Sequence, residues 1–253
     1  MVSVIFPAAG QGKRMQAGVN KVFLELGGKP MFVRTLLKFS AVPAVDELII
    51  VTGKAEMAPM RHVLERVPEL KPWCVVEGGS ERQYSVKNGL DMVSKDAEIV
   101  LVHDAARPLV SRETIEAVIA EARKNGAAIA AVPEKNTVKV VNADGVVPAT
   151  PPRSTLWAVQ TPQGFRRDIL VRANEQAAED GFLGTDDASL VERLGVPVHV
   201  VMGGYENIKV TTPGDLIVAE AFLHEGRGEQ LKEKLADAAE TAKEKLQKLT
   251  NQK

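Results

Sequence analysis

The sequence predicts an α/β fold in which helices cover both faces of a mainly parallel β-sheet. Short β-branched runs alternate with helical stretches through the first 132 residues, and the alternation resumes after residue 166. The strand runs are almost wholly apolar, which is typical of strands buried on both faces. Parallel neighbours need a crossover between them, and a helix in each interval supplies it.

The predicted strands are short apolar runs that stop at turn-forming or polar residues. The first run ends at Pro7 and leads directly into a glycine loop, which is typical of an α/β opening. Strands are expected at Val2–Phe6, Glu47–Thr52, Trp73–Val76, Ile99–His103, Ala127–Val132 and Val196–Met202.

The predicted helices lie between these runs and carry recognisable start signals. Ser80 and Ser111 are placed to cap the helices that follow them, and Pro213 suits a first helical turn. Helices are expected over Pro30–Phe39, Glu56–Arg66, Ser80–Val93, Ser111–Lys124, Arg166–Glu179 and Pro213–His224, with a further helix start at Thr185–Asp187.

Residues 133–160 interrupt the alternation and predict an arm that protrudes from the sheet. Thr137–Val141 and Val146–Val147 flank the turn sequence Asn142–Gly145, which favours a β-hairpin, and a proline-rich stretch follows. An isolated two-stranded ribbon is only marginally stable in water, so the hairpin packs either on a second subunit or on the protein's own surface. The sequence leaves both alternatives open.

The composition excludes several classes of protein. With 32 Lys and Arg against 33 Asp and Glu, the net charge is −1, so nucleic-acid binding is not expected and any phosphate affinity must be local. A single cysteine, Cys74, excludes a disulfide framework and favours a reducing, cytoplasmic location. No apolar run approaches the ~20 residues of a spanning helix, so membrane association is not expected.

The end of the chain differs from the rest. Residues 226–253 are rich in charge, and their apolar side chains recur at spacings of three and four, which draws one helical stripe. We therefore expect one domain over residues 1–225, followed by a charged helical tail that is either docked or solvated.

Three clusters of residues are expected at the carboxyl edge of the sheet, where open α/β folds bind ligands. The first is the loop Ala8-Ala-Gly-Gln-Gly-Lys-Arg-Met15, followed by Lys21. Gly10 and Gly12 let backbone N–H groups approach an anion, and the basic side chains add donors, so the loop predicts a phosphate cradle. The pattern matches neither a P-loop nor a dinucleotide fingerprint, and a plain glycine turn is the alternative.

The second cluster is Glu77-Gly-Gly-Ser-Glu-Arg-Gln-Tyr-Ser85. Paired glycines permit a planar base to lie against the backbone, and Ser85 offers a hydroxyl contact. An ordinary helix cap explains Ser80, but it leaves the two glycines and Arg82 unexplained.

The third cluster is His103-Asp-Ala-Ala-Arg-Pro108. Mg²⁺ uses one or two carboxylates and completes its shell with water and phosphates, so Asp104 beside phosphate-binding loops is a candidate ligand. A local ion pair between Asp104 and Arg107 is the alternative. His103 is expected to be a packed, hydrogen-bonded histidine, because no second histidine or cysteine lies at metal-ligand spacing.

Five motifs, in their order and spacing, resemble the family of 2-C-methyl-D-erythritol 4-phosphate cytidylyltransferases of the non-mevalonate isoprenoid pathway. They are the first loop with Lys21, the His103–Pro108 cluster, Thr161-Pro-Gln163, Thr185-Asp-Asp-Ala-Ser189 and Asn207-Ile-Lys-Val-Thr211, and the resemblance spans residues 2 to about 224. It implies a Rossmann-like domain whose β-arm interlocks two subunits of a homodimer, and Mg²⁺-dependent transfer of a cytidylyl group from CTP to methylerythritol phosphate. Other divalent cations are possible.

The resemblance also implies roles for particular residues. Those implied to hold the nucleotide are Ala8, Ala9, Gly10, Gly12, Gly79, Ser85 and Ala105, with Arg14, Lys21 and Lys209 as catalytic cations and Asp104 as the metal ligand. Those implied to bind the acceptor are Arg107, Thr161, Thr185 and Asp186, together with Thr137 and Arg153 from the partner's arm.

Two other functions compete with this interpretation. A ribitol-5-phosphate cytidylyltransferase shares CTP, Mg²⁺ and the arm, but Ala105-Ala106 and Thr185-Asp-Asp-Ala188 favour the methylerythritol family. A catalytically silent nucleotide-binding dimer would be expected to lack a phosphate-binding or metal residue, and Arg14, Lys21, Asp104 and Lys209 are all present. Ser80 and Asn136 stand where many members of the family have aspartate.

Overall fold

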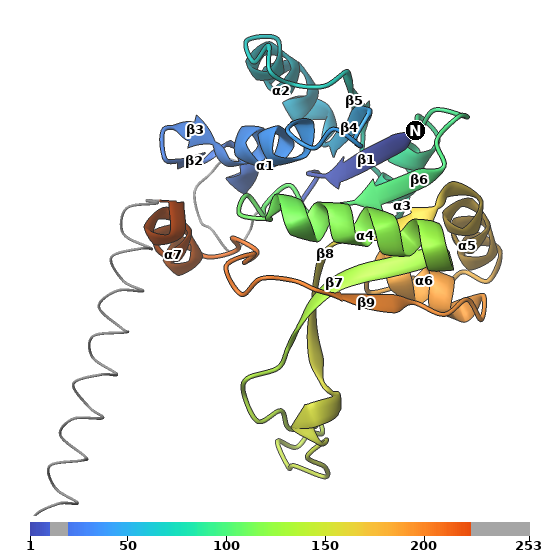
Figure 1. The fold of residues 1–253 in the computed structure, drawn as a ribbon. Helices are drawn as coiled ribbons and strands as arrows, with labels where there is room; N and C mark the ends of the chain where they lie inside the picture. The colour runs from blue at the N-terminus through green and yellow to red at the C-terminus, as the bar shows by residue number, and fades with distance from the viewer. Residues whose placement is uncertain (11–19, 224–253) are drawn as a thin grey trace, which may run out of the picture.

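The computed structural model describes residues 1–10 and 20–223 (Figure 1). Within them, seven strands form one sheet in the order β5-β4-β1-β6-β8-β7-β9. The strands are β1 (Val2–Pro7), β4 (Glu47–Thr52), β5 (Trp73–Glu77), β6 (Ile99–Val102), β7 (Ala127–Pro133), β8 (Trp157–Arg166) and β9 (His199–Met202). Every pairing is parallel except those that β8 makes with β6 and β7. The predicted α/β fold with a mainly parallel sheet is confirmed.

Helices cover both faces of the sheet because each central strand buries side chains in both directions. In β1, Val4 and Phe6 join one core cluster, whereas Ile5 joins the other. The first cluster packs under α1 (Met31–Ser40), α2 (Met57–Leu64) and α4 (Arg112–Asn125), and the second under α3 (Arg82–Leu90), α5 (Arg167–Glu179) and α6 (Asp187–Arg193). The last described helix, α7 (Pro213–Leu223), packs beside β2 (Glu25–Leu26).

Strand β8 lies between β6 and β7 and was not predicted from the sequence. The reason is Pro162, since proline has no N–H to donate and argues against a central strand. The structure accommodates it at an irregularity, because the β7 register passes from Gln163 to Val159 and leaves residues 160–162 without a ladder partner on β7.

Three smaller expectations are also corrected. A two-residue pairing of β2 (Glu25–Leu26) with β3 (Lys29–Pro30) was not expected, and Gly27 and Gly28 at its turn have φ of 56° and 74°, as a primed hairpin turn requires. The last strand begins at His199 rather than Val196. Ser80 caps no helix, because α3 begins at Arg82 after an N-cap residue, Glu81, whose side chain makes no capping bond.

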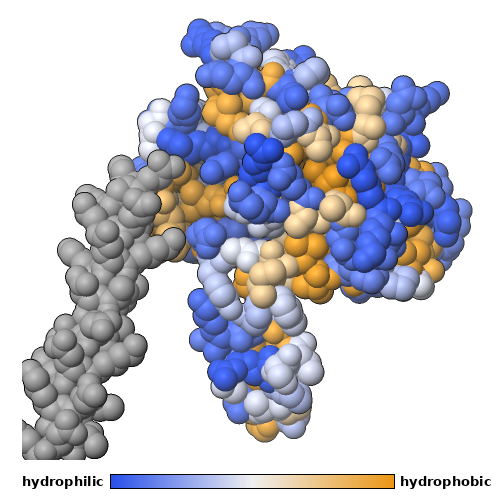
Figure 2. Space-filling model, viewed as in Figure 1, coloured by the Kyte–Doolittle hydropathy of each residue, from blue (hydrophilic) through white to orange (hydrophobic). Residues whose placement is uncertain are grey.

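Residues 134–156 leave the sheet between β7 and β8 as a projecting arm (Figures 1 and 2). The expected turn forms, and Asn142 accepts a backbone hydrogen bond from Gly145 at 3.1 Å. The expected two-stranded ladder is wrong, because a single antiparallel bridge joins Val140 and Ala149. Prolines 148, 151 and 152 supply no N–H groups, so the returning chain cannot continue the pairing.

The predicted tail over 226–253 and the loop residues Gly12 and Arg14 lie outside the described residues. Within the described part of the chain, no helix is long and apolar enough to cross a membrane.

Candidate functional site

A cavity of about 340 Å³ opens at the carboxyl edge of the sheet. Strands β1, β5 and β6 run in the same direction, because β1 pairs in parallel with β4 and β6, and β4 pairs in parallel with β5. The loops that follow the three strands therefore meet at this edge. The cavity is lined by Pro7, Ala8, Ala9, Gly10, Lys21, Val22, Gly79, Ser80, Glu81, Arg82, Ser85, Asp104, Ala105, Ala106, Lys209 and Thr211. The three sequence clusters therefore converge on one space, as predicted.

The described start of the first loop ends at Gly10. Among the residues that the structure describes, no atom lies within 4 Å of a Cβ added at Gly10. Asn20 holds the end of β1 by donating from its side-chain amide to the carbonyl of Ala8 at 2.9 Å. Lys21 lines the cavity and donates from Nζ to the carbonyl of Val210 at 2.8 Å, which ties this loop to the segment that carries Lys209.

The second loop is built tightly around its glycines. A Cβ at Gly79 would lie 2.5 Å from the Cβ of Tyr84, so only glycine fits there. The Gly79 N–H donates to Ser85 Oγ at 3.1 Å, and that hydroxyl donates to the carbonyl of Glu81 at 3.0 Å. Ser85 thus fixes the loop as well as lining the cavity.

Asp104 lies at the centre of a cluster of cationic side chains. Its Oδ2 is 2.9 Å from Lys209 Nζ and 3.4 Å from Arg107 Nε, and its Oδ1 is 3.9 Å from Arg82 Nε. Burial alone would raise the pKa of Asp104, but these three cations outweigh it and hold that pKa at about 2. Asp104 is therefore an ionised carboxylate in the cavity wall, and the ion pair with Arg107 that the sequence offered as an alternative is present.

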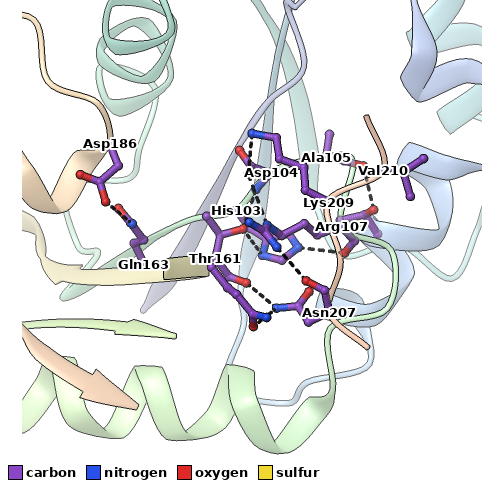
Figure 3. Close-up of polar contacts among 12 residues, drawn as sticks. His103, Asp104, Ala105, Arg107, Thr161, Gln163, Asp186, Asn207, Lys209 and Val210 are labelled. Atoms are coloured by element: carbon purple, nitrogen blue, oxygen red, sulfur yellow. Dashed lines mark hydrogen bonds and ion pairs between the residues drawn. The ribbon is translucent and has the colours of Figure 1, made fainter. Parts of the chain in front are cut away.

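His103 is packed and hydrogen-bonded, as expected (Figure 3). It is fully buried, and burial lowers its pKa to about 3, so the ring is neutral. The carbonyl of Arg107 lies 3.1 Å from Nε2 and can only accept, so Nε2 carries the proton.

Nδ1 is consequently an acceptor, and the Thr161 hydroxyl 3.1 Å away donates to it. The same hydroxyl accepts the backbone N–H of Asp104 at 3.0 Å. Thr161 is buried, and both roles of its hydroxyl are taken by the protein. It holds the start of the Asp104 loop, and it does not line the cavity.

The residues expected on the acceptor side lie around the cavity rather than in its wall. Arg107 donates from Nη1 to the carbonyl of Asn207 at 2.7 Å. Asp186 caps α6 by accepting from the Ser189 N–H at 3.0 Å, and it accepts from Gln163 Nε2 at 2.7 Å. Thr185, one residue earlier, is exposed.

The two arm residues are exposed, and neither lines this cavity within the single described chain. Arg153 donates from Nη1 to the carbonyl of Lys135 at 3.1 Å, which is a contact within the arm itself. Thr137 lies in the exposed first half of the arm.

Three polar residues of this region were not predicted to belong to the site. Arg82 lines the cavity and Asp187 pairs with it; the sequence signal for Arg82 was its unexplained place in the second glycine loop. Asn207 is buried and donates from Nδ2 to Gln160 Oε1 at 3.0 Å and to the carbonyl of Thr161 at 2.9 Å. Its motif was noted, but a hydrogen-bond network buried between strands has no sequence signature.

The donor set fits a magnesium ion that is shared with a phosphorylated ligand. The described residues hold no group of three or more metal-ligating side chains, and Asp104 is the ionised carboxylate that the third cluster places in the cavity wall. One ionised carboxylate suffices for Mg²⁺ when phosphate and water oxygens complete the shell. Lys209 occupies Oδ2 and is 40% exposed, so its side chain is free to turn toward a phosphate instead.

The fold and this cavity define a class: α/β proteins that present backbone loops, one carboxylate and several cations to a phosphorylated ligand at the carboxyl edge of the sheet. The comparison with known families narrows the class. The chain belongs to the 2-C-methyl-D-erythritol 4-phosphate cytidylyltransferase family, whose family model matches residues 2–225.

Individual proteins with similar sequences bear the same family name. A 2-C-methyl-D-erythritol 4-phosphate cytidylyltransferase of Symbiobacterium thermophilum is 52% identical over 224 residues, which cover 88% of this chain and 93% of the relative. One from Geotalea uraniireducens is 50% identical and covers 88% and 96%.

Solved structures agree as well. A 4-diphosphocytidyl-2C-methyl-D-erythritol synthase from Anaerococcus prevotii superimposes with a TM-score of 0.79 at 35% identity, covering 89% of this chain and 96% of that one. The Thermus thermophilus cytidylyltransferase gives 0.72 at 34% identity, covering 87% and 97%. The family predicted from the five motifs is confirmed, and these matches do not support the ribitol phosphate alternative.

Proposed function

We propose that the protein joins CTP and 2-C-methyl-D-erythritol 4-phosphate to give 4-diphosphocytidyl-2-C-methyl-D-erythritol and pyrophosphate. The observation that carries the proposal is the ionised Asp104 among Lys209, Arg82 and Arg107 in a cavity whose other walls are two glycine loops. Family membership over residues 2–225 supports this substrate pair.

The reaction is an in-line displacement at phosphorus. An oxygen of the acceptor phosphate forms a bond to the α-phosphorus of CTP, the bond from that phosphorus to the α,β-bridging oxygen breaks, and pyrophosphate leaves with the electron pair. A phosphate monoester has a second pKa of about 6, so at neutral pH the acceptor attacks without a general base. Both ring nitrogens of the neutral His103 are engaged in hydrogen bonds within the protein, so His103 does not act as the base in this step.

Catalysis then rests on orientation and on neutralising charge, because two polyanions must meet and further charge develops as the leaving group departs. We assign Lys21 and Lys209 this role, together with Arg14. Gly79 and Ser85 would hold the cytosine, and Ala8, Ala9, Gly10, Gly12 and Ala105 would contact the rest of the nucleotide. Lys209 pairs with Asp104 at 2.9 Å in the described chain and would exchange that contact for the α-phosphate.

Asp104 would hold Mg²⁺ together with the nucleotide phosphates, or another divalent cation in its place. When bound, the ion supplies Lewis-acid stabilisation of charge on the phosphoryl oxygens. Arg107, Thr185 and Asp186 would orient the acceptor, and Thr161 would support the surface beneath it by fixing the Asp104 loop.

The arm is proposed to complete the partner's site in a homodimer. Its valines Val138, Val140, Val141, Val146 and Val147 are 38–59% exposed. A run of exposed apolar side chains is expected to be covered by another molecule. Thr137 and Arg153 would then bind the acceptor phosphate in the partner's cavity, and an arginine fork suits a phosphate because it donates two parallel hydrogen bonds. Cys74 as the single cysteine remains the basis for proposing a cytoplasmic location.

The decisive experiment is pyrophosphate release by the purified protein with Mg²⁺ and CTP. Methylerythritol 4-phosphate and ribitol 5-phosphate are compared as acceptors, and ATP, GTP and UTP as donors. Release with CTP and methylerythritol phosphate is expected. Preference for ribitol phosphate, or CTP binding without release from either acceptor, would overturn the proposal in favour of the ribitol enzyme or of a silent nucleotide-binding dimer.

A further inference from the structure

Arg82 lines the cavity, and its guanidinium group forms an ion pair with the buried carboxylate of Asp187. Its Nη2 lies 2.8 Å from Oδ2 of Asp187, and the Asp187 side chain is 1% exposed. Burial raises the pKa of Asp187, which shows how costly its charge is at this position, and the adjacent guanidinium opposes that shift. A buried carboxylate of this kind is an anchor that holds Arg82 in one orientation.

The two helices that contribute this pair are joined by further contacts. Gln83, the residue after Arg82, donates from Nε2 to the carbonyl of Phe182 at 3.0 Å and accepts the Gly184 N–H at 2.9 Å. The loop that carries Thr185 and Asp186 is therefore tied to the start of α3. Arg82 lies between the glycine loop on the nucleotide side and the α6 segment on the acceptor side.

The ion pair with Asp187 leaves donor capacity on Arg82. A guanidinium has five N–H donors, and among the described residues its other charged contact is Asp104 Oδ1, at 3.9 Å from Nε. The side chain remains 33% exposed and lines the cavity. An anion that enters between Asp104 and α6 would thus meet an oriented guanidinium with free N–H groups.

We propose that Arg82, anchored by Asp187, binds phosphate at the junction of the nucleotide and acceptor sides of the cavity. The inference rests on the proposed function, since a junction of two phosphates arises only when a phosphorylated acceptor approaches the α-phosphate of the nucleotide. Arg82 is a catalytic residue in this scheme, because it contacts the groups that react. Asp187 is a positioning residue, because it acts through Arg82.

The test compares Arg82→Gln, Arg82→Lys and Asp187→Asn in the full-length protein. Steady-state turnover is measured with each substrate varied, CTP affinity is measured by calorimetry without acceptor, and stability is measured by thermal unfolding. Arg193→Gln is the matched control, because Arg193 forms a comparable 2.8 Å pair with Asp180 on the surface.

Arg82→Gln is expected to lower kcat by about 10²-fold, because one preorganised donor is lost, and to raise the acceptor KM. The affinity for CTP is expected to change by less than about threefold, as for a contact made mainly once the acceptor is bound. Arg82→Lys should recover part of the loss, because it restores the charge without the fork. Asp187→Asn should lower kcat less than Arg82→Gln does, and the double variant should be no slower than Arg82→Gln. Arg193→Gln should leave turnover unchanged.

Wild-type turnover in Arg82→Gln would overturn the inference, and so would a loss of thermal stability without a loss of turnover. A loss of CTP affinity in the absence of acceptor that is as large as the loss of turnover would also overturn it. A wild-type protein that releases no pyrophosphate from CTP and methylerythritol phosphate overturns the proposed function instead. The two failures are therefore distinguishable.

Discussion

At the scale of single residues, the site is set by the competition between burial and neighbouring charge. Asp104 and His103 are adjacent in sequence, and both are buried. Asp104 stays ionised because three cations surround it, whereas His103 stays neutral because burial disfavours its charged form. The same burial therefore gives a charged cavity wall at one residue and an uncharged support at the next.

Lys21 provides the direct test of charge neutralisation. Lys21→Ala is expected to lower turnover by at least about 10²-fold, the lower end for loss of one preorganised stabilising donor. Pyrophosphate release measures it, and Lys95→Ala, which removes an exposed lysine that does not line the cavity, is the matched control. Near-normal turnover of Lys21→Ala would remove Lys21 from the catalytic set.

His103 makes stability depend on pH. Its pKa is about 3 in the folded protein against an ordinary value of 6.5, so the unfolded chain binds a proton below pH 6.5 while the folded chain does not. The free energy of unfolding should therefore fall between pH 6.5 and 3, with a limiting slope of about 1.4 kcal/mol per pH unit from this group. Asp104 adds a fall in the same direction below about pH 3.8, its ordinary pKa, and this fall continues down to its lowered pKa of about 2.

Urea unfolding at several pH values measures this slope, and nuclear magnetic resonance of the imidazole nitrogens reports the protonation state directly. The His103 resonances should remain those of the neutral Nε2–H form down to pH 5. A titration of His103 with a midpoint near 6.5 would contradict the prediction.

At the scale of elements, small residues decide how closely helices approach the sheet. A Cβ at Gly89 in α3 would lie 2.7 Å from Cγ2 of Ile5 and 2.9 Å from Cγ2 of Val51. Both methyl groups belong to fully buried strand residues, so neither can withdraw. Gly89 thereby fixes the distance of α3 from β1 and β4, and with it the position of the glycine loop that precedes α3.

Gly89→Ala is expected to destabilise the protein by about 1 kcal/mol, because overpacking of about 1–3 kcal/mol outweighs the helix propensity gained. Gly214→Ala in α7 is the matched control. Among the described residues its Cβ would meet only the Thr212 hydroxyl, at 3.8 Å, so the substitution should be neutral or stabilising. Thermal unfolding compares the two. A Gly89→Ala protein as stable as Gly214→Ala would show that α3 can shift away from the sheet at little cost.

At the scale of the whole molecule, the arm is exposed to solvent along most of its length in the single chain. Its residues from 135 to 150 are all exposed, and a single bridge between Val140 and Ala149 joins its two halves. At its base Trp157, Val159, Val200 and Met202 are also exposed, by 40–59%. The exposed apolar side chains thus continue from the arm onto the adjoining strands, which supports the intersubunit contact proposed for the arm.

Mixing two inactive variants tests whether the arm acts in the partner's site. Lys21→Ala and Arg153→Ala are each expected to be inactive as homodimers. Mixed dimers keep one intact site, in which Lys21 of one subunit meets Arg153 from the other, so random exchange should restore up to about a quarter of wild-type turnover. No recovery, once subunit exchange is verified, would place Arg153 in its own subunit's site or outside the reaction.

The sequence by itself determined the alternation of strands and helices outside residues 133–166, the three clusters at the carboxyl edge and the family. Apolar periodicity, capping residues and glycine positions are local signals, and parallel strands bring the loops that follow them to one edge. Val2–Phe6 and Ile99–His103 were therefore predictable within a residue or two, and so was the packed His103.

Only the tertiary structure decided what depends on partners distant in sequence. Strand β8 is central despite Pro162, because the irregularity beside β7 removes the need for an N–H there. The roles of Thr161 and Asn207 are fixed by hydrogen bonds spanning 46 to 58 residues. The pairing of Arg82 with Asp187 likewise joins two helices that only the packed fold brings together, and no local pattern encodes such a contact.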